Sequence, residues 1–308
     1  LRAARLPSLI TAAGRRSSPP PSALRGASRA AVKAWLRAER EHGTDFWDGL
    51  SKPLHGGGGR GLIRIARPER GAAGRYLQEW RAGVSMSLIV AADGRHGVPL
   101  AASRQLSGWP AVGATGLTYA GSLLAGGRAR LAELPLTDGG GRGALEALTE
   151  VLVRHTGLRG LVGVDGILDV DGTFWLVEVN PRWCASFELL DELLPTPLFR
   201  LHEQACEGLL PGAWATDGAR SLVAGKVVVY REPHLPAAAA PDLSSLELPG
   251  CRLADLPRIG TMLPPGGPIC TVLATAADET ELLDQLLASA RRVLCCVAET
   301  LPSGAHAR

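Results

Sequence analysis

The sequence predicts an α+β protein whose strands form antiparallel sheets. Short apolar runs bounded by glycine follow one another between residues 61 and 108, a pattern typical of strands joined by turns. The Asp93-Gly94 pair closes one of these runs, and Asp-Gly is a strong hairpin signal. Helical spacing of apolar residues occurs separately, as in residues 143–156. This order of elements favours α+β over a regular alternation of strands and helices.

The elements can be assigned in order along the chain. Strands are expected at residues 61–66, 75–80, 84–94, 98–108, 221–230 and 268–274. Helices are expected at residues 28–41, 143–156, 186–194, 197–208 and 278–298. The second of these helices ends at Gly157, because glycine commonly terminates helices. A Pro- and Ala-rich connector at 235–242 precedes the last strand.

The composition is that of an ordinary globular protein. The 308 residues carry a formal net charge of +3, with 46% hydrophobic and 20% charged residues, and this length predicts two domains or one large domain with lobes. No apolar stretch is long enough to span a membrane. The six cysteines form no Cys-x-x-Cys pair. We interpret them as reduced thiols of a cytoplasmic protein.

The first 40 residues are strongly basic, with eight arginines and Lys33 against Glu39 alone. Such a segment can be an organellar targeting sequence or an arm that binds nucleic acid. It can also be the lead-in to a chain whose beginning is missing, since the sequence starts at Leu1 rather than Met. We favour this last interpretation. Without these residues the chain is slightly acidic, which argues against a nucleic-acid-binding protein.

Residues 163–182, GVDGILDVDGTFWLVEVNPR, predict two strands joined by a two-residue turn at Asp171-Gly172. Counting outward from this turn pairs Val170 with Thr173, Asp165 with Glu178 and Gly163 with Asn180. Paired residues share a face. The face predicted to pack in a core carries Val162, Val164, Leu168, Val170, Trp175, Val177 and Val179. The other face carries Asp165, Ile167, Asp169, Leu176, Glu178 and Asn180.

The opposed carboxylates of Asp165 and Glu178 predict a cation site. Like charges placed opposite each other destabilise a sheet unless a cation lies between them. Oxygen ligands favour Mg²⁺ or Mn²⁺, and Mg²⁺ needs only one or two carboxylates when phosphates complete its coordination. The alternative is a solvated outer face of a sheet. Asn180 and Arg182 favour the cation site, because an amide oxygen can bind the metal and a guanidinium can bind phosphate.

Residues 51–62, SKPLHGGGGRGL, form a second informative motif. Lys52 is followed by four glycines, Gly56 to Gly59, whose bare backbone amides can close over phosphates. The motif fits neither the P-loop nor the dinucleotide-binding pattern. A flexible linker is the alternative. The strand expected directly afterwards weakens that alternative.

The three motifs KPLHGGGGRGL, YLQEW and GVDGILDVDGTFWLVEVNPR, in this order, resemble the ATP-grasp superfamily, in particular its carboligases and carboxylate–amine ligases related to biotin carboxylase. The resemblance covers about residues 46–210. It implies an ATP-grasp fold, in which two α+β lobes with antiparallel sheets hold ATP between them. The implied organisation is a lead-in at 1–45, an ATP-grasp domain at 46–210 with a lobe boundary near 80, and a C-terminal extension of strands and a helix at 211–308.

The resemblance also implies the roles of the site residues. ATP would be bound by Lys52, Gly56, Gly57, Gly58, Gly59, Glu79 and Trp80. Mg²⁺ or Mn²⁺ would be held by Asp165, Glu178 and Asn180. Arg182 and Lys52 would act on the phosphate that is transferred.

The sequence departs from the family pattern at three points. No lysine lies some forty residues before the loop lysine, since Lys33 is too close, and the usual N-terminal domain is absent. The acidic residue that biotin carboxylases carry six positions after the asparagine is replaced by Ser186, with Glu188 two positions further. This argues against bicarbonate chemistry.

Other residues have weaker signals. Arg104 and Gln105 lie on a strand expected to run past the nucleotide, where Arg104 binds phosphate or is an ordinary surface residue. His55, His202 and Cys184 are interpreted as structural rather than catalytic.

Together with the predicted cation site, the resemblance implies an ATP- and Mg²⁺-dependent ligase that activates a carboxylate for attack by an amine or similar nucleophile, with cofactor biosynthesis as one setting. Its partners are small-molecule carboxylate and amine substrates, not nucleic acid or membranes. The alternative is an ATP-binding module without turnover. The sequence leaves the acid, the nucleophile and the oligomeric state open.

Overall fold

The computed structural model describes residues 49–65, 73–127, 141–170, 172–214 and 220–300. The lead-in expected at 1–45 and the helix expected at 28–41 lie outside the described residues. Lys33 and Asp171 lie outside them as well.

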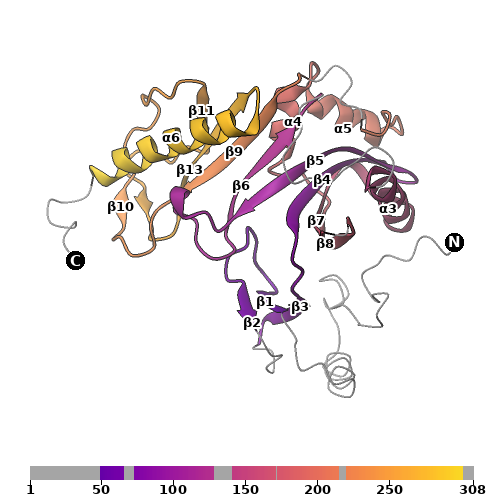
Figure 1. The fold of residues 1–308 in the computed structure, drawn as a ribbon, viewed down its shortest axis with the longest axis horizontal. Coiled ribbons are helices and arrows are strands. Elements are labelled where there is room, and N and C mark those ends of the chain that lie inside the picture. Colours follow the sequence, from indigo (N-terminus) through magenta and orange to yellow (C-terminus); the bar gives the residue numbers. More distant parts are fainter. Residues whose placement is uncertain (1–48, 66–72, 128–140, 171, 215–219, 301–308) are drawn as a thin grey trace.

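Eight strands form one large antiparallel sheet (Figure 1). Its order is β11-β13-β9-β6-β5-β4-β7-β8, and every neighbouring pair is antiparallel. The bounds are β4 Val84–Asp93, β5 Gly97–Ser107, β6 Tyr119–Ala125, β7 Arg159–Leu168, β8 Phe174–Asn180, β9 Val223–Tyr230, β11 Cys251–Ala254 and β13 Pro268–Ala276. The predicted α+β class is confirmed.

Three further strands form a small sheet with the order β2-β1-β3, and it lies apart from the large sheet in Figure 1. The bounds are β1 Gly49–Pro53, β2 Ile63–Ile65 and β3 Arg75–Glu79. The segment 54–62, which contains Gly56 to Gly59 and is called the glycine loop below, connects β1 to β2. A two-stranded sheet pairs β10 (Ala238–Ala239) with β12 (Met262–Leu263).

Helices cover both faces of the large sheet. Alternate residues of β4 belong to different cores: Met86 and Val90 face the core that contains helix α3 (Gly141–Thr156), while Ile89 faces the core that contains α4 (Phe187–Leu193) and α5 (Leu198–Cys206). Helix α6 (Glu279–Ala298) packs on the same face as α3, over β9 and β13. Among the described residues, no helix is long and apolar enough to cross a membrane.

The tail of the chain is part of the large sheet. β9 pairs with β6 on one side and with β13 on the other, so the sheet continues across residue 210. The helix expected at 278–298 is α6, whose first turn is capped by the Asp278 carboxylate accepting a hydrogen bond from the Glu281 amide. Such a cap satisfies an amide that has no partner within the helix.

β6 is a strand that the sequence pattern did not predict. Its residues, YAGSLLA, include no β-branched side chain, so the local preference for a strand is weak. Pairing with β5 on one side and β9 on the other decides its conformation. A short 3₁₀ helix, η1 (Pro110–Val112), precedes it.

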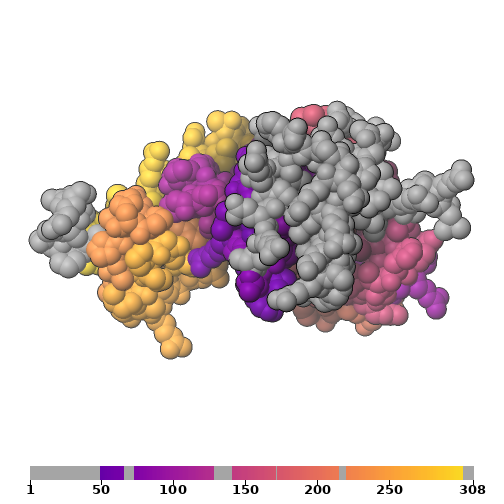
Figure 2. Space-filling view, turned by 90° about the horizontal axis from the view of Figure 1, so that it is seen from below, coloured from indigo at the N-terminus to yellow at the C-terminus, as the bar shows by residue number. Residues whose placement is uncertain are grey.

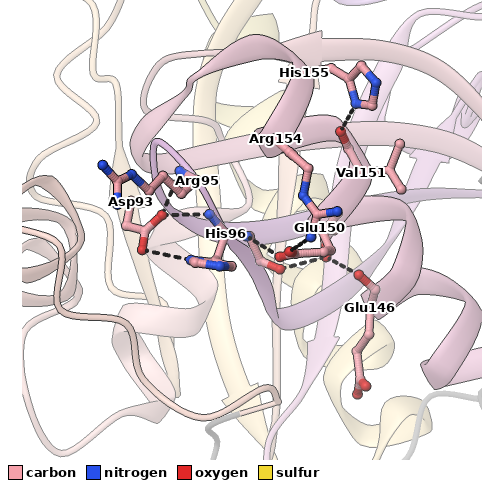
Figure 3. Close-up of polar contacts among 10 residues, drawn as sticks. Asp93, Arg95, His96, Glu146, Glu150, Val151, Arg154 and His155 are labelled. Carbon is pink, nitrogen blue, oxygen red and sulfur yellow. Dashed lines mark hydrogen bonds and ion pairs between the residues drawn. The ribbon is translucent and has the colours of Figure 1, made fainter. Parts of the chain in front are cut away.

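The β4–β5 turn predicted from Asp93-Gly94 is present and is attached to α3 (Figure 3). The Asp93 carboxylate accepts hydrogen bonds from the amides of Arg95 and His96, at 2.7 and 2.6 Å. Gly94 adopts a φ of 91°, a conformation that glycine reaches without strain. These bonds lower the pKa of Asp93, with the His96 amide as the largest cause. The turn therefore keeps its carboxylate ionised.

The predicted hairpin is correct at its open end and wrong near its turn. Asp165 pairs with Glu178, and Gly163 pairs with Asn180. Val177 is then the extra residue of a β-bulge, beyond which Ile167 pairs with Trp175 and Leu168 with Phe174. A bulge shifts the register by one residue and so exchanges the two faces of a strand.

The bulge has two consequences for the predicted faces. Trp175 shares a face with Asp165 rather than with the core, and Leu176 packs against the core instead. The strands end at Leu168 and Phe174, so Val170 pairs with no residue in the sheet and is 94% exposed. The predicted places of Trp175, Leu176 and Val170 are therefore wrong.

Candidate active site

A cavity of about 920 Å³ lies between the small sheet and the face of the large sheet that carries Asp165. It is lined by the glycine loop, by β1 and β3, and by β4, β5, β7 and β8. All the predicted site residues line it: Lys52, Gly56, Gly57, Gly58, Gly59, Glu79, Trp80, Asp165, Glu178, Asn180 and Arg182. The fold thus brings together residues that are up to 130 positions apart in the sequence, from Lys52 to Arg182.

Strand β1 carries Lys52 into the cavity. Lys52 is only 8% exposed. Burial lowers the pKa of its ammonium group, while the carboxylates of Glu178 and Asp165 raise it. Because the two lobes contribute opposite charges to one cavity, Lys52 and the acid pair partly balance each other across it.

The glycine loop is held over the cavity by contacts at both ends. At the small sheet, the Arg75 guanidinium donates hydrogen bonds to the Ser51 hydroxyl (2.8 Å) and to the Gly61 carbonyl (2.6 Å). At the large sheet, the amide of Tyr119 donates to the Gly58 carbonyl at 2.8 Å. In the view from below, the indigo segment lies beside the magenta segment that precedes β6 (Figure 2).

Gly59 is required by this position of the loop. Its φ is +72°, and a Cβ atom added there would lie 1.9 Å from the Leu117 carbonyl oxygen. Gly57, in contrast, has open space around it. Beyond the glycines, the Arg60 guanidinium lies 5.7 Å from the centre of the Tyr230 ring. The run of glycines therefore combines a close approach to the main chain at Gly59 with open space at Gly57 and Gly58.

Asp165 and Glu178 face each other across β7 and β8, as predicted. The pKa of Asp165 is raised to about 6, mainly by burial and also by the Glu178 carboxylate, while hydrogen bonds from Ser87 and Asn180 and the charge of Arg182 act in the opposite direction. Without a cation, the folded chain resists ionising this carboxyl group. A divalent cation bound by Asp165 and Glu178 would stabilise the ionised form and so offset the free-energy cost of ionising Asp165 in this buried place.

A continuous chain of hydrogen bonds crosses the cavity wall through Asp165. The Asn180 amide nitrogen donates to Asp165 Oδ2 at 3.0 Å, and the Arg182 guanidinium donates to Asn180 Oδ1 at 2.9 Å. On the other side, Gln105 Nε2 donates to Asp165 Oδ1 at 3.2 Å. Arg182 is thereby fixed at the edge of the site and has further N–H groups for a ligand.

The donor set fits a hard cation such as Mg²⁺. Two carboxylates lie opposite each other, and Mg²⁺ is commonly bound by one or two carboxylates with substrate phosphates completing the shell. The Asn180 amide oxygen accepts a hydrogen bond from Arg182 in this structure, so it would bind the metal only after turning from that contact. In the described part of the chain, no group of three or more His, Cys, Asp or Glu side chains could hold a metal ion without other ligands. The site thus suits a cation that arrives with a phosphate ligand.

The segment after β3 forms the wall between the lobes. The Glu79 carboxylate pairs with Arg81 at 2.9 Å, and the Arg81 guanidinium lies 3.9 Å from the centre of the Trp175 ring. The position of Trp175 is also fixed by its indole N–H, which donates a hydrogen bond to the Asp169 carboxylate at 2.8 Å. Sequence reasoning missed Trp175 and Arg81 as cavity residues, and no local signal marks the bulge that turns Trp175 inward.

The residues with weaker sequence signals differ in whether they line the cavity and in what they contact. Cys184 lines the cavity, but burial raises the pKa of its thiol to about 11, so it is a neutral thiol and a poor nucleophile. His202 accepts a hydrogen bond from the Leu161 amide at 3.0 Å, a structural contact. Arg104 forms an ion pair with Glu279 of α6. His55 is exposed and does not line the cavity.

Ser186 occupies the position at which the sequence departs from the family pattern. It is buried, lines the cavity, and its hydroxyl has no hydrogen-bond partner among the described residues. Glu188, two positions further, forms an ion pair with the buried Lys226 of β9. Glu188 is thus engaged away from the carboxylate pair.

Comparison with known proteins gives one family and many similar folds. Residues 47–186 match the family model of the ATP-grasp domain. Carboxyaminoimidazole ribonucleotide synthase from Aspergillus clavatus, solved with ATP, is 16% identical with a TM-score of 0.58, over 87% of this chain and 66% of that one. No curated protein matches the chain.

Two other solved structures have the same fold. The biotin carboxylase domain of 2-oxoglutarate carboxylase from Hydrogenobacter thermophilus, solved with MgADP and bicarbonate, is 15% identical with a TM-score of 0.59, over 83% of this chain and 58% of that one. L-amino acid ligase from Bacillus licheniformis is 15% identical with a TM-score of 0.59, over 83% and 64%. This chain spans less than two thirds of the length of each of the three proteins.

Proposed function

The chain belongs to the ATP-grasp superfamily, and from this premise we propose that it is an ATP- and Mg²⁺-dependent ligase that joins a carboxylate to an amine or similar nucleophile. The observation that carries the proposal is the opposition of Asp165 and Glu178 in a cavity that also holds Lys52 and Arg182. Acids and cations in one cavity suit a metal-bound, transferable phosphate.

ATP would lie between the two sheets. Lys52 donates to its phosphates, and the amides of Gly56 to Gly59 close over them. Glu79 and Trp80 lie beside the base, on the segment that joins the lobes. The cavity volume of about 920 Å³ is supporting evidence, because it falls within the range of ligand pockets.

Asp165, Glu178 and Asn180 would hold Mg²⁺ or Mn²⁺, which when bound neutralises phosphate charge. Lys52 and Arg182 add fixed positive charge on either side of the transferred group. Their contribution is greatest where charge develops during transfer, since such groups are already in position before the reaction.

The reaction would proceed in two steps. A carboxylate oxygen of the substrate attacks the γ-phosphorus of ATP, the bond to the bridging oxygen breaks, and ADP leaves. The amine then attacks the carbonyl carbon of the acyl phosphate, the bond from that carbon to the phosphate oxygen breaks, and phosphate leaves while the amine nitrogen loses a proton to solvent. The glycine loop excludes water, which would otherwise hydrolyse the acyl phosphate.

One similar fold and the free cysteines support two further parts of the proposal, namely the kind of bond that is formed and the cellular compartment. One similar fold belongs to an L-amino acid ligase, which favours formation of a C–N bond, and cofactor biosynthesis is one setting for such a ligase. All six cysteines are free thiols, as in a reducing compartment such as the cytoplasm. Residues 46–210 would carry the ATP-grasp motifs, and β9, β11 and β13 of the part after residue 210 belong to the same large sheet, so the two parts would fold as one unit.

The alternative function is an ATP-binding module without turnover. Two observations favour it, because each removes a charged group that the family pattern includes. Lys52 is the single lysine that lines the cavity in the described part of the chain, whereas the family pattern has a second one. Ser186 stands where biotin carboxylases carry an acidic residue. Such a module would bind Mg-nucleotide and release no ADP from ATP.

Calorimetric titration with ADP, with and without Mg²⁺, tests the site first. We expect magnesium-dependent binding that Glu178→Ala abolishes. Mixtures of carboxylates and amines can then be screened for release of ADP from ATP. Binding without release in any mixture favours the module, and absence of nucleotide binding overturns both functions.

A further inference from the structure

Gln105 of β5 lies between a hydroxyl and a carboxylate in the wall of the cavity. Ser85 Oγ donates a hydrogen bond to Gln105 Oε1 at 2.8 Å, and Gln105 Nε2 donates to Asp165 Oδ1 at 3.2 Å. The Asp165 carboxylate can only accept when it is ionised. The NH₂ end of the Gln105 amide must therefore face Asp165, and Ser85 holds the other end.

The Asp165 carboxylate is held from two opposite sides. Gln105 donates to Oδ1 from β5, and Asn180 donates to Oδ2 from β8. A carboxylate has about four acceptor sites, and Gln105, Asn180 and Ser87 use three of them, so Asp165 keeps a direction for a further ligand. Two donors on opposite sides also fix the plane of the group. Asp165 therefore presents fixed oxygens to the space beside Glu178.

The contact between Gln105 and Asp165 depends on a small residue between their strands. β4 separates β5 from β7 in the sheet, and the β4 residue paired with Asp165 is Ser87. A larger side chain at this place would stand between the Gln105 amide and the carboxylate. Ser87 instead leaves the path open and itself hydrogen-bonds Asp165.

We infer that Gln105 is a positioning residue for the cation site: it holds Asp165 in the orientation that binds Mg²⁺ or Mn²⁺, and Ser85 acts through it. This inference rests on the proposed function, since it concerns the same site. Residues that hydrogen-bond metal ligands from outside commonly contribute about 10- to 100-fold to metal affinity. A glutamine that only lined the cavity wall would contribute nothing to that affinity.

Gln105→Met tests the inference, because methionine has a similar length and makes neither hydrogen bond. Electron paramagnetic resonance measures binding of Mn²⁺ in the presence of ADP, independently of turnover. We expect Gln105→Met to weaken Mn²⁺ binding by about 10-fold or more. Gln285→Met on α6 is the matched control: Gln285 bonds Glu281 and does not line the cavity. It is expected to bind Mn²⁺ as the wild type does.

Ser85→Ala distinguishes positioning from a general structural effect. It leaves Gln105 in place but frees its Oε1, so we expect a smaller loss of Mn²⁺ affinity than for Gln105→Met. The double variant should bind no more weakly than Gln105→Met alone, because Ser85 acts only through Gln105. Thermal unfolding establishes that each variant is folded.

The possible outcomes are distinct. If the wild type binds no Mn²⁺ with ADP, the proposed function and this inference both fail. If the wild type binds and Gln105→Met binds equally well, only the positioning role is wrong. Additive losses in the double variant would also contradict it, since Ser85 and Gln105 would then act independently.

Discussion

The hydroxyl of Tyr230 donates a hydrogen bond to the main-chain carbonyl of Tyr119 at 2.8 Å, and this contact connects the tail of the chain to the glycine loop. The Tyr119 amide donates in turn to the Gly58 carbonyl, and Arg60 lies over the Tyr230 ring. Burial raises the pKa of Tyr230, while Arg60 lowers it, so the hydroxyl remains a donor at neutral pH. β9 thus supports the loop that closes the cavity.

We expect Arg60→Ala to weaken ADP binding by about 2- to 5-fold, because a cation–π contact contributes roughly 0.5–1 kcal/mol. Loss of the contact frees the loop without removing a residue of the carboxylate site. Calorimetric titration with ADP and Mg²⁺ measures the effect. Arg252→Ala is the control, since Arg252 pairs with Glu192 and does not line the cavity. Unchanged affinity in Arg60→Ala would exclude the Arg60 contact as a support of the closed loop.

Gly59→Ala should weaken nucleotide binding by about tenfold or more, whereas Gly57→Ala should leave it unchanged. At Gly59 the added Cβ would lie 1.9 Å from the Leu117 carbonyl oxygen and the backbone φ is positive, so the loop must move away from the segment that precedes β6. Strain of this kind costs on the order of 1–3 kcal/mol, and about 1.4 kcal/mol corresponds to a factor of ten. Gly57 has open space. Equal affinities of the two variants would contradict the closed position of the loop.

The stability of Asp165→Asn relative to the wild type should increase between about pH 4.5 and pH 7.5. The pKa of Asp165 is raised to about 6 in the folded chain, above an ordinary value of about 3.9. A group with a raised folded pKa stabilises the fold fully below its unfolded pKa. That contribution is lost as the pH rises through about 6. The variant has no such loss, and we expect a relative gain on the order of 1–2 kcal/mol.

Urea unfolding without divalent cations, at both pH values, measures this difference. Asp169→Asn is a suitable control, since Asp169 lies in the hairpin loop and bonds Thr173 and Trp175 rather than the acid pair. A relative stability of Asp165→Asn that is independent of pH would mean that Asp165 titrates at its ordinary pKa.

A chain that ends at residue 210 should show no cooperative unfolding transition. It would lack β9, which pairs with β6, and α6, which covers Leu123 of β6. The edge of β6 and the apolar face beside it would then be exposed to water. Circular dichroism on heating tests this. A cooperative transition in the shortened chain would show that 46–210 folds independently.

The packing of α6 against the large sheet can also be tested by a single substitution in the full chain. Leu286→Ala removes a fully buried side chain of α6 and should destabilise the protein by roughly 2–5 kcal/mol. Leu256→Ala, at a leucine that is 42% exposed, should change stability by less than about 1 kcal/mol. Similar effects of the two substitutions would mean that α6 contributes little to the core.

The sequence alone determined the elements with strong local signals. Helices α3 and α6 follow from apolar spacing over several turns, because a helix repeats every 3.6 residues whatever its surroundings. The opposition of Asp165 and Glu178 was predicted from a turn signal and the two-residue period of strands, and it holds because the bulge at Val177 offsets the different register near the turn. The ATP-grasp motifs then indicated which residues would meet in one cavity, although they are far apart in the chain.

Only the tertiary structure decided the features that depend on partners distant in sequence. β6 is a strand because β5 and β9 lie on both sides of it, and the bulge at Val177 turns Trp175 towards Arg81 and the cavity. The contacts of Gln105 with Asp165 and of Tyr230 with Tyr119 join separate strands. Side-chain period and turn preference act over a few residues, whereas register shifts and contacts between strands are set by packing of the whole sheet.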